Sequence, residues 1–136
     1  MANPTPYSLA VQLNKSFNAT VEAARAALAA EGFGVLMEAD LQATFLKKLG
    51  AESSSYVILG ACSPRDAFEA LSLEPNLGLL LPCNVIVRDA GNGATVVAAL
   101  DPLAQLGLAD NEALLPAATA IRERIARALE ALEKSS

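Results

Sequence analysis

The chain shows two periods of hydrophobic and polar residues, a period of two in short segments and a helical period in longer ones. Residues 7–13 alternate, with Leu9, Val11 and Leu13 apolar and Gln12 polar, so they predict a half-buried strand. Four further segments have strand composition, at residues 33–40, 55–62, 83–89 and 94–100. In the first of these, Phe33, Val35 and Met37 are expected to share one face. Because "DAGNG" separates the last two, we expect those two strands to pair as a hairpin.

Helices are predicted between these strands by residues that start and end helices. Asn18, Asp40 and Ser63 can each cap a helix start, and Gly32 and Gly50 can each supply the left-handed residue that ends one. A final helix is expected where four apolar residues share one face: Ile121, Ile125, Leu129 and Leu132. The third helix is expected to turn four residues inward: Ala67, Phe68, Ala70 and Leu71.

The order of these elements favours an α+β fold in which helices pack on one sheet. The length of 136 residues suits a single domain over 1–136, and no linker divides the chain. No apolar run approaches the roughly 20 residues of a membrane span, and the first residues lack a secretory leader pattern. We therefore expect a cytoplasmic protein without membrane contact.

Charge and composition exclude several classes of function. The net charge is −5 and the cations are scattered, so we do not expect nucleic acid as a partner. The chain has no histidine, which excludes serine triads and most zinc sites. Glu38, Asp40, Glu69 and Glu74 lie near turns and helix ends, where capping and solvation account for them, so no catalytic residue is predicted.

The two cysteines are the residues most capable of chemistry. Cys62 directly precedes the helix start formed by Ser63, Pro64 and Asp66, so the helix dipole is expected to lower the pKa of its thiol. The alternative is that Cys62 only fills a corner between strand and helix, since free cysteine is often buried. Strand alternation places Cys62 on one face together with Tyr56, Ile58 and Gly60.

Five segments in order resemble the domain of unknown function 302 family: "EGFGVLMEAD", "KKLG", "YVILGACSPRDAFEAL", "EPNLGLLLPCNV" and "LDP". The resemblance covers about residues 17–132. It implies a fold similar to that of the TATA-box-binding protein, with a curved antiparallel sheet of about five strands, helices on one side and a homodimer. The family usually has asparagine where this chain has Ser63. The family has no assigned activity, so the resemblance implies only candidate positions: Tyr56, Gly60, Cys62, Pro64, Glu74, Pro75, Gly78, Pro82, Cys83 and Asn84.

Three hypotheses follow for function. The first is a binding module for a small molecule or a soft metal ion, with Cys62 and Cys83 as metal ligands. Its predicted binding residues are Tyr56, Gly60, Cys62, Ser63, Cys83 and Asn84. Tyr56, Gly60 and both cysteines are expected to share one face of the sheet. The second is thiol redox or sulfur chemistry, with Cys62 reactive and Cys83 resolving. The third is an interaction or assembly domain in which both cysteines only pack, and which exposed apolar area on the outer sheet face would support. No cofactor is predicted.

Overall fold

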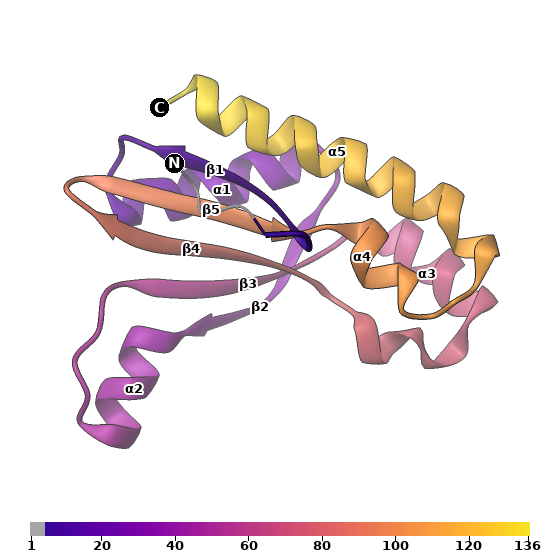
Figure 1. The fold of residues 1–136 in the computed structure, drawn as a ribbon, viewed down its shortest axis with the longest axis horizontal. Helices are drawn as coiled ribbons and strands as arrows, with labels where there is room; N and C mark the ends of the chain where they lie inside the picture. Colours follow the sequence, from indigo (N-terminus) through magenta and orange to yellow (C-terminus); the bar gives the residue numbers. More distant parts are fainter. Residues whose placement is uncertain (1–4) are drawn as a thin grey trace.

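The computed structural model describes residues 5–136, and its centre is one five-stranded antiparallel sheet in the order β1-β5-β4-β3-β2 (Figure 1). The strands are β1 (Ser8–Leu13), β2 (Gly34–Asp40), β3 (Tyr56–Cys62), β4 (Cys83–Gly91) and β5 (Ala94–Leu100). The helices are α1 (Phe17–Ala30), α2 (Leu41–Leu49), α3 (Pro64–Leu73), α4 (Pro102–Gly107) and α5 (Leu115–Lys134), with short 3-10 helices η1 (Pro75–Leu80) and η2 (Glu112–Leu114). The predicted α+β class and the β4–β5 hairpin are confirmed.

One face of the sheet carries the hydrophobic core and is covered by α1 and α5 (Figure 1). Leu59, Val87 and Val97 have no exposed surface on this face, and Leu28 of α1 and Ile125 of α5 belong to the same cluster. Burying each of these side chains contributes about 1.5–3 kcal/mol. The core therefore fixes the strand register, because a one-residue slip would move every buried side chain of a strand to the other face.

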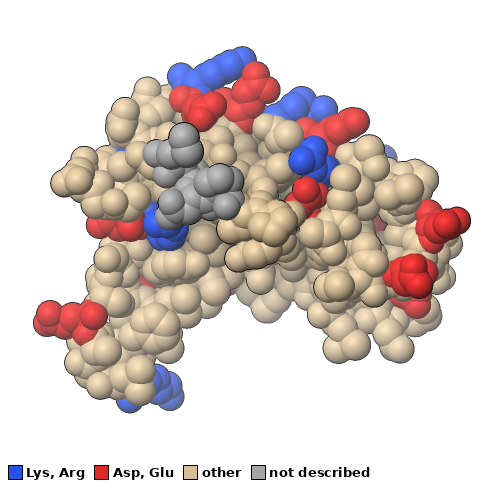
Figure 2. Space-filling model, viewed as in Figure 1, with Lys and Arg blue, Asp and Glu red and all other residues tan. Residues whose placement is uncertain are grey.

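In the part of the chain that the structure describes, no helix layer covers the opposite face of the sheet, called the open face below (Figure 1). The register aligns one apolar row across all five strands: Ala10, Ala98, Ile86, Ile58 and Ala39. Helix α2 lies at one end of this face and buries none of its own residues. Figure 2 shows almost no charged side chain on the surface between α2 and the α3–η1 region. This is exposed apolar area of the kind that marks an interface.

A β-bulge in β2 corrects one sequence prediction. Val35 pairs with Ala61, but Met37, two residues further along, pairs with Gly60, so one extra residue is inserted between them. A bulge interrupts the alternation of side chains. Met37 is 58% exposed whereas Phe33 is buried, and the prediction that they share one face with Val35 is wrong.

Two helix predictions also need correction. Helix α1 begins after Ser16, whose hydroxyl accepts a hydrogen bond from the Ala19 N–H at 3.3 Å, so Asn18 lies inside the first turn rather than at the cap. In α3, Phe68 is 77% exposed and Leu71 is also exposed, so these two side chains do not enter the interior. The cap at Asp40 and the left-handed Gly50 are confirmed. Among residues 5–136, no helix is both long and apolar enough to cross a bilayer.

Candidate functional site

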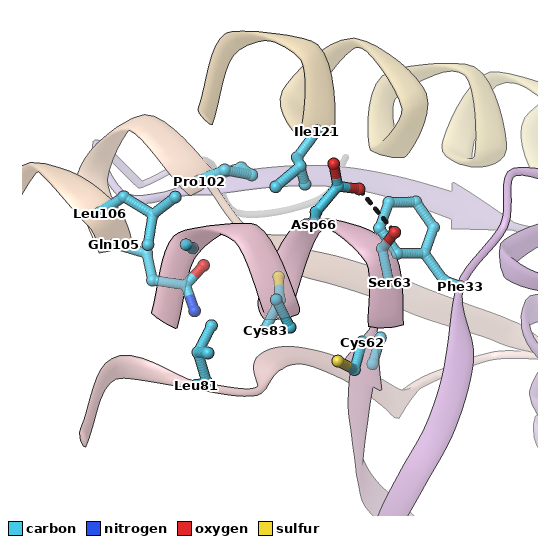
Figure 3. Close-up of a pocket in the computed structure, with 13 residues that line it drawn as sticks. Phe33, Cys62, Ser63, Asp66, Leu81, Cys83, Pro102, Gln105, Leu106 and Ile121 are labelled. Carbon is cyan, nitrogen blue, oxygen red and sulfur yellow. Dashed lines mark hydrogen bonds between the residues drawn. The ribbon is translucent and has the colours of Figure 1, made fainter. Parts of the chain in front are cut away.

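A small cavity lies at the end of the sheet where β3 leads into α3, and both cysteines line it (Figure 3). The cavity offers about 40 Å³ to the centre of a water-sized sphere. This exceeds the roughly 10–15 Å³ that a cavity needs in order to hold one water molecule. Its walls come from β3 and β4 below, α3 and α4 at the sides and Ile121 of α5. Most of the lining is apolar, so polar atoms are few and their positions matter.

The local sequence explains why space remains at this corner. Helix α3 presents Ala67 and Ala70 to the cavity, and these short side chains do not reach the thiols across it. Leu81 closes one end of the cavity, and the Leu81–Pro82 peptide bond, which is cis, leads from there into β4. A helix with two larger residues at the alanine positions would fill the space. The cavity is thus a consequence of the small residues in "PRDAFEAL".

Cys83 is a buried, neutral thiol. Its side chain lies on the core face of β4, opposite Ala61 of β3, and it is only 8% exposed. The Sγ donates a hydrogen bond to the backbone oxygen of Leu100 at 3.4 Å. Burial raises the pKa of Cys83 to about 12; the nearby Asp101 carboxylate also raises this pKa, and the bond to Leu100 lowers it.

Cys62 is partly exposed and is likewise protonated at neutral pH. Burial raises the pKa of this thiol, and the negative charge of Asp66 raises it further. The prediction that the helix dipole lowers the pKa of Cys62 is therefore wrong. Burial is the larger cause, and the carboxylate of Asp66 in the first turn of α3 adds to it by opposing the effect of the helix N-terminus.

A polar network closes the cavity beside Cys62. The Ser63 hydroxyl donates to the Asp66 carboxylate at 2.5 Å, and Arg124 of α5 forms an ion pair with the same carboxylate. Arg124 also donates to the Glu31 backbone oxygen at 3.2 Å and lies 4.8 Å from the centre of the Phe33 ring. Ser63 is the N-cap residue as predicted, but its side chain makes no hydrogen bond to a backbone N–H, so the predicted capping bond is wrong.

Gln105 of α4 supplies a polar group on the other side of the cavity. Its side chain is 6% exposed, and its Nε2 donates a hydrogen bond to the Leu80 backbone oxygen. Within residues 5–136 its Oε1 receives no hydrogen bond. In Figure 3 this oxygen points toward the side of the cavity where Cys83 lies. This oxygen is not among the fully buried polar atoms that lack a partner, so it is accessible and can accept a hydrogen bond from a bound molecule.

The structure brings together only part of the predicted site. Cys62, Ser63 and Cys83 line the cavity, although alternation along the paired strands places Cys62 and Cys83 on opposite faces. Both cysteines line the same cavity because it lies beyond the end of the sheet, where β3 has turned into α3. The prediction that both thiols share one sheet face is wrong, and the two cysteines are free rather than joined.

Tyr56, Gly60 and Asn84 lie elsewhere. Asn84 pairs with Gly60, and Tyr56 pairs with Arg88 at the start of β3, roughly 20 Å along the strand from its last residue. These three residues belong to the open face. The space beside Gly60 is filled, because a Cβ atom there would lie 2.8 Å from Cγ of Pro82. Gly60 is thus required for close packing and leaves no groove.

A carboxylate, that of Asp66, lines the cavity with the two thiols, but it is paired with Arg124. Within residues 5–136, no three or more Cys, Asp or Glu side chains are arranged to hold a metal ion. A soft ion bound by Cys62 and Cys83 also requires both thiols to lose a proton, which the raised pKa values of both oppose.

Ten lining residues were not predicted as site residues, among them Asp66, Leu81 and Gln105. Gln105 was missed because α4 itself was not predicted. The signal was present, since Asp101 caps α4 through the Leu103 N–H at 2.9 Å and Pro102 occupies its first position.

The fold and the cavity define a class of α+β domain, with helices on one face of an antiparallel sheet and two thiols at the sheet end. The chain belongs to the family described as Domain of unknown function DUF302, whose sequence model matches residues 9–132. The match begins at residue 9, ahead of the resemblance noted from about residue 17. A similar solved structure is that of the uncharacterized conserved protein DUF302 from Bacillus stearothermophilus, with 29% identity and a TM-score of 0.84 over 93% of this chain and 98% of that one. No curated protein matches this chain.

Proposed function

We propose that this domain is a binding module whose cavity at Cys62 and Cys83 holds a small uncharged molecule. The observation that carries the proposal is the Gln105 side chain, which lines the cavity together with both thiols and whose Oε1 accepts no hydrogen bond from residues 5–136. A ligand with a hydroxyl or N–H group would donate to this oxygen. Its apolar part would lie against Ala67 and Ile121.

The ligand is uncharged because the cavity has no free charge to pair with it. Both thiols keep their protons at neutral pH, given that the pKa of each is raised. The carboxylate of Asp66 is already paired with Arg124. An ion would lose its hydration on entering this apolar space without gaining a partner, which is costly.

A methyl NMR titration with 1-propanol tests the proposal, using propionate as the charged analogue of similar size. We expect the methyl signals of Ala67 and Ile121 to shift with 1-propanol and not with propionate. The ceiling of about 1.5 kcal/mol per heavy atom limits the affinity for such a probe to roughly 40 µM at best, so a weaker, millimolar response is expected.

Filling the cavity provides the control. Ala67→Leu should abolish the response to 1-propanol, whereas Ala120→Leu, on an exposed position of α5, should leave it unchanged. Equal shifts with propionate, or shifts that persist in Ala67→Leu, would contradict the proposal.

A cytoplasmic location stays a prediction from the sequence; two free thiols suit a reducing compartment.

A second proposal concerns self-association through the open face as a homodimer. The row of Ala10, Ala98, Ile86, Ile58 and Ala39 is apolar and crosses the whole sheet. Helix α2 leaves Leu46 and Leu49 exposed beside it. Two copies meeting face to face would bury this surface in both subunits.

Light scattering after size exclusion tests this association. The wild type should have the mass of a dimer, and Ile86→Glu, which adds a charge to the centre of the row, should be a monomer. Leu115→Glu changes an exposed leucine at the start of α5 and should remain a dimer. A monomeric wild type would rule out this second proposal.

A further inference from the structure

Helix α3 lines one side of the cavity, and the α3–η1 segment, residues 64–80, is weakly anchored to the rest of the molecule. Helix α3 buries one residue, Ala70, and η1 buries one, Leu77. Both belong to a small cluster with Leu106, Leu114 and Ala118, separate from the main core. By contrast α5 alone buries five residues. Segments with few buried apolar contacts open locally at a low free-energy cost.

Polar contacts supply the other attachments of this segment. At its start, Asp66 is held by Arg124 of α5 and by the Ser63 hydroxyl. At its end, Gln105 of α4 donates to the backbone oxygen of Leu80. The Asp66–Arg124 pair is about three-quarters buried, with side-chain exposures of 23% and 24%. An ion pair with this degree of burial is screened less by solvent than the exposed pairs elsewhere on α5.

We infer that the α3–η1 segment is a lid over the Cys62–Cys83 cavity and that the Asp66–Arg124 ion pair holds it closed. The inference rests on the proposed function in that a ligand must enter a cavity which the closed lid covers. Opening moves Ala67 and Ala70 away from the cavity while β3, β4 and α4 stay in place. Arg124 is anchored separately by the Glu31 backbone oxygen and the Phe33 ring, so it remains on the fixed part of the molecule when Asp66 leaves.

Alkylation of Cys83 with iodoacetamide, followed by peptide mass spectrometry, measures the opening without any ligand. Cys83 is 8% exposed in the closed form, so it reacts only when the lid or the whole protein opens. We expect Arg124→Gln to accelerate alkylation of Cys83 by about tenfold, the effect of losing one charge-assisted hydrogen bond. Asp66→Asn removes the same ion pair by changing the partner that lies on the lid, and it should accelerate alkylation of Cys83 by a similar factor.

Arg127→Gln is the matched control on the same helix. Arg127 pairs with Glu31 at 3.1 Å on the exposed surface and does not line the cavity, so this variant should alkylate like the wild type. Amide hydrogen exchange separates lid opening from global unfolding. In Arg124→Gln, the amides of α3 should exchange faster, while the amide of Val97 in the central sheet should keep its wild-type rate.

Two results would overturn the inference. One is an unchanged alkylation rate of Cys83 in both Arg124→Gln and Asp66→Asn. The other is an equal acceleration of exchange in α3 and at Val97, which would mean that Cys83 becomes accessible by global unfolding. Because no ligand is used, the alkylation result is independent of the titration with 1-propanol. If the lid opens but the cavity binds no alcohol, this inference stands and the proposed function is refuted.

Discussion

Alkaline pH should destabilise this protein through Cys83. In the unfolded chain the thiol titrates near its ordinary pKa of 9.0, whereas burial in the fold raises the pKa of Cys83 to about 12. Between these two values the unfolded state has lost the proton that the folded state keeps. The unfolded state therefore binds fewer protons, and the free energy of unfolding falls as pH rises. Below pH 9 both states hold the proton, and this contribution is constant.

The expected size follows from the same two values. One pH unit above the unfolded pKa, the loss is about 1.4 kcal/mol, and it grows by about 1.4 kcal/mol per unit until the folded thiol ionises. Lysine and tyrosine groups also titrate in this range, so the effect of Cys83 must be isolated by difference. Cys83→Ala removes the titrating group and leaves the other ionisable side chains in place.

Urea unfolding followed by circular dichroism gives the measurement. We expect the free energy of unfolding of the wild type, minus that of Cys83→Ala, to fall by about 1.4 kcal/mol between pH 7 and pH 10. The lost packing of the sulfur adds an offset that does not vary with pH. A difference that stays constant over this range would refute the burial of Cys83 as a neutral thiol, and with it the uncharged character of the cavity.

Three further changes test the packing and helix capping of the fold. Gly60→Ala should lower the free energy of unfolding by about 1–3 kcal/mol, because the new Cβ would lie 2.8 Å from Cγ of Pro82. Gly34→Ala should lower it little, because the new Cβ there would have no atom within 4 Å. Thermal unfolding of both variants checks this. Asp40→Ala should destabilise α2 by about 1 kcal/mol through loss of its cap at the Ala43 N–H, measured as faster amide exchange confined to α2. Thr20→Val should stabilise the protein by about 1 kcal/mol in urea unfolding, since Thr20 Oγ1 is buried without a hydrogen-bond partner among residues 5–136; a loss of stability would show that the hydroxyl has a partner.

The sheet and the long helix could be predicted because their signals are local. The alternation at residues 55–62, the "DAGNG" turn and the spacing of Ile121, Ile125 and Leu129 each lie within one short stretch. The bulge at Val35–Met37 could not be predicted, because it depends on which residues of β3 the strand pairs with. The exposure of Phe68 is also a tertiary outcome, since α3 lies beyond the sheet end and packs through its alanines.

The site was predicted in part for the same reason. Cys62 and Ser63 are adjacent in the sequence, and Cys83 reaches them through the pairing of β3 with β4. The pKa of Cys62 was predicted in the wrong direction, because the helix dipole is a local feature whereas burial, the larger cause, depends on distant segments that pack around the thiol. Gln105 required the position of α4, which only the folded chain defines.

A crystal structure of the protein grown with 1-propanol tests the central claim most directly. The account predicts electron density for the alcohol in the cavity, with its hydroxyl about 3 Å from Gln105 Oε1 and its carbon chain against Ala67 and Cys83. It would be contradicted by a structure in which alcohol is ordered only elsewhere on the surface while the cavity between Cys62 and Cys83 is empty or closed by side chains.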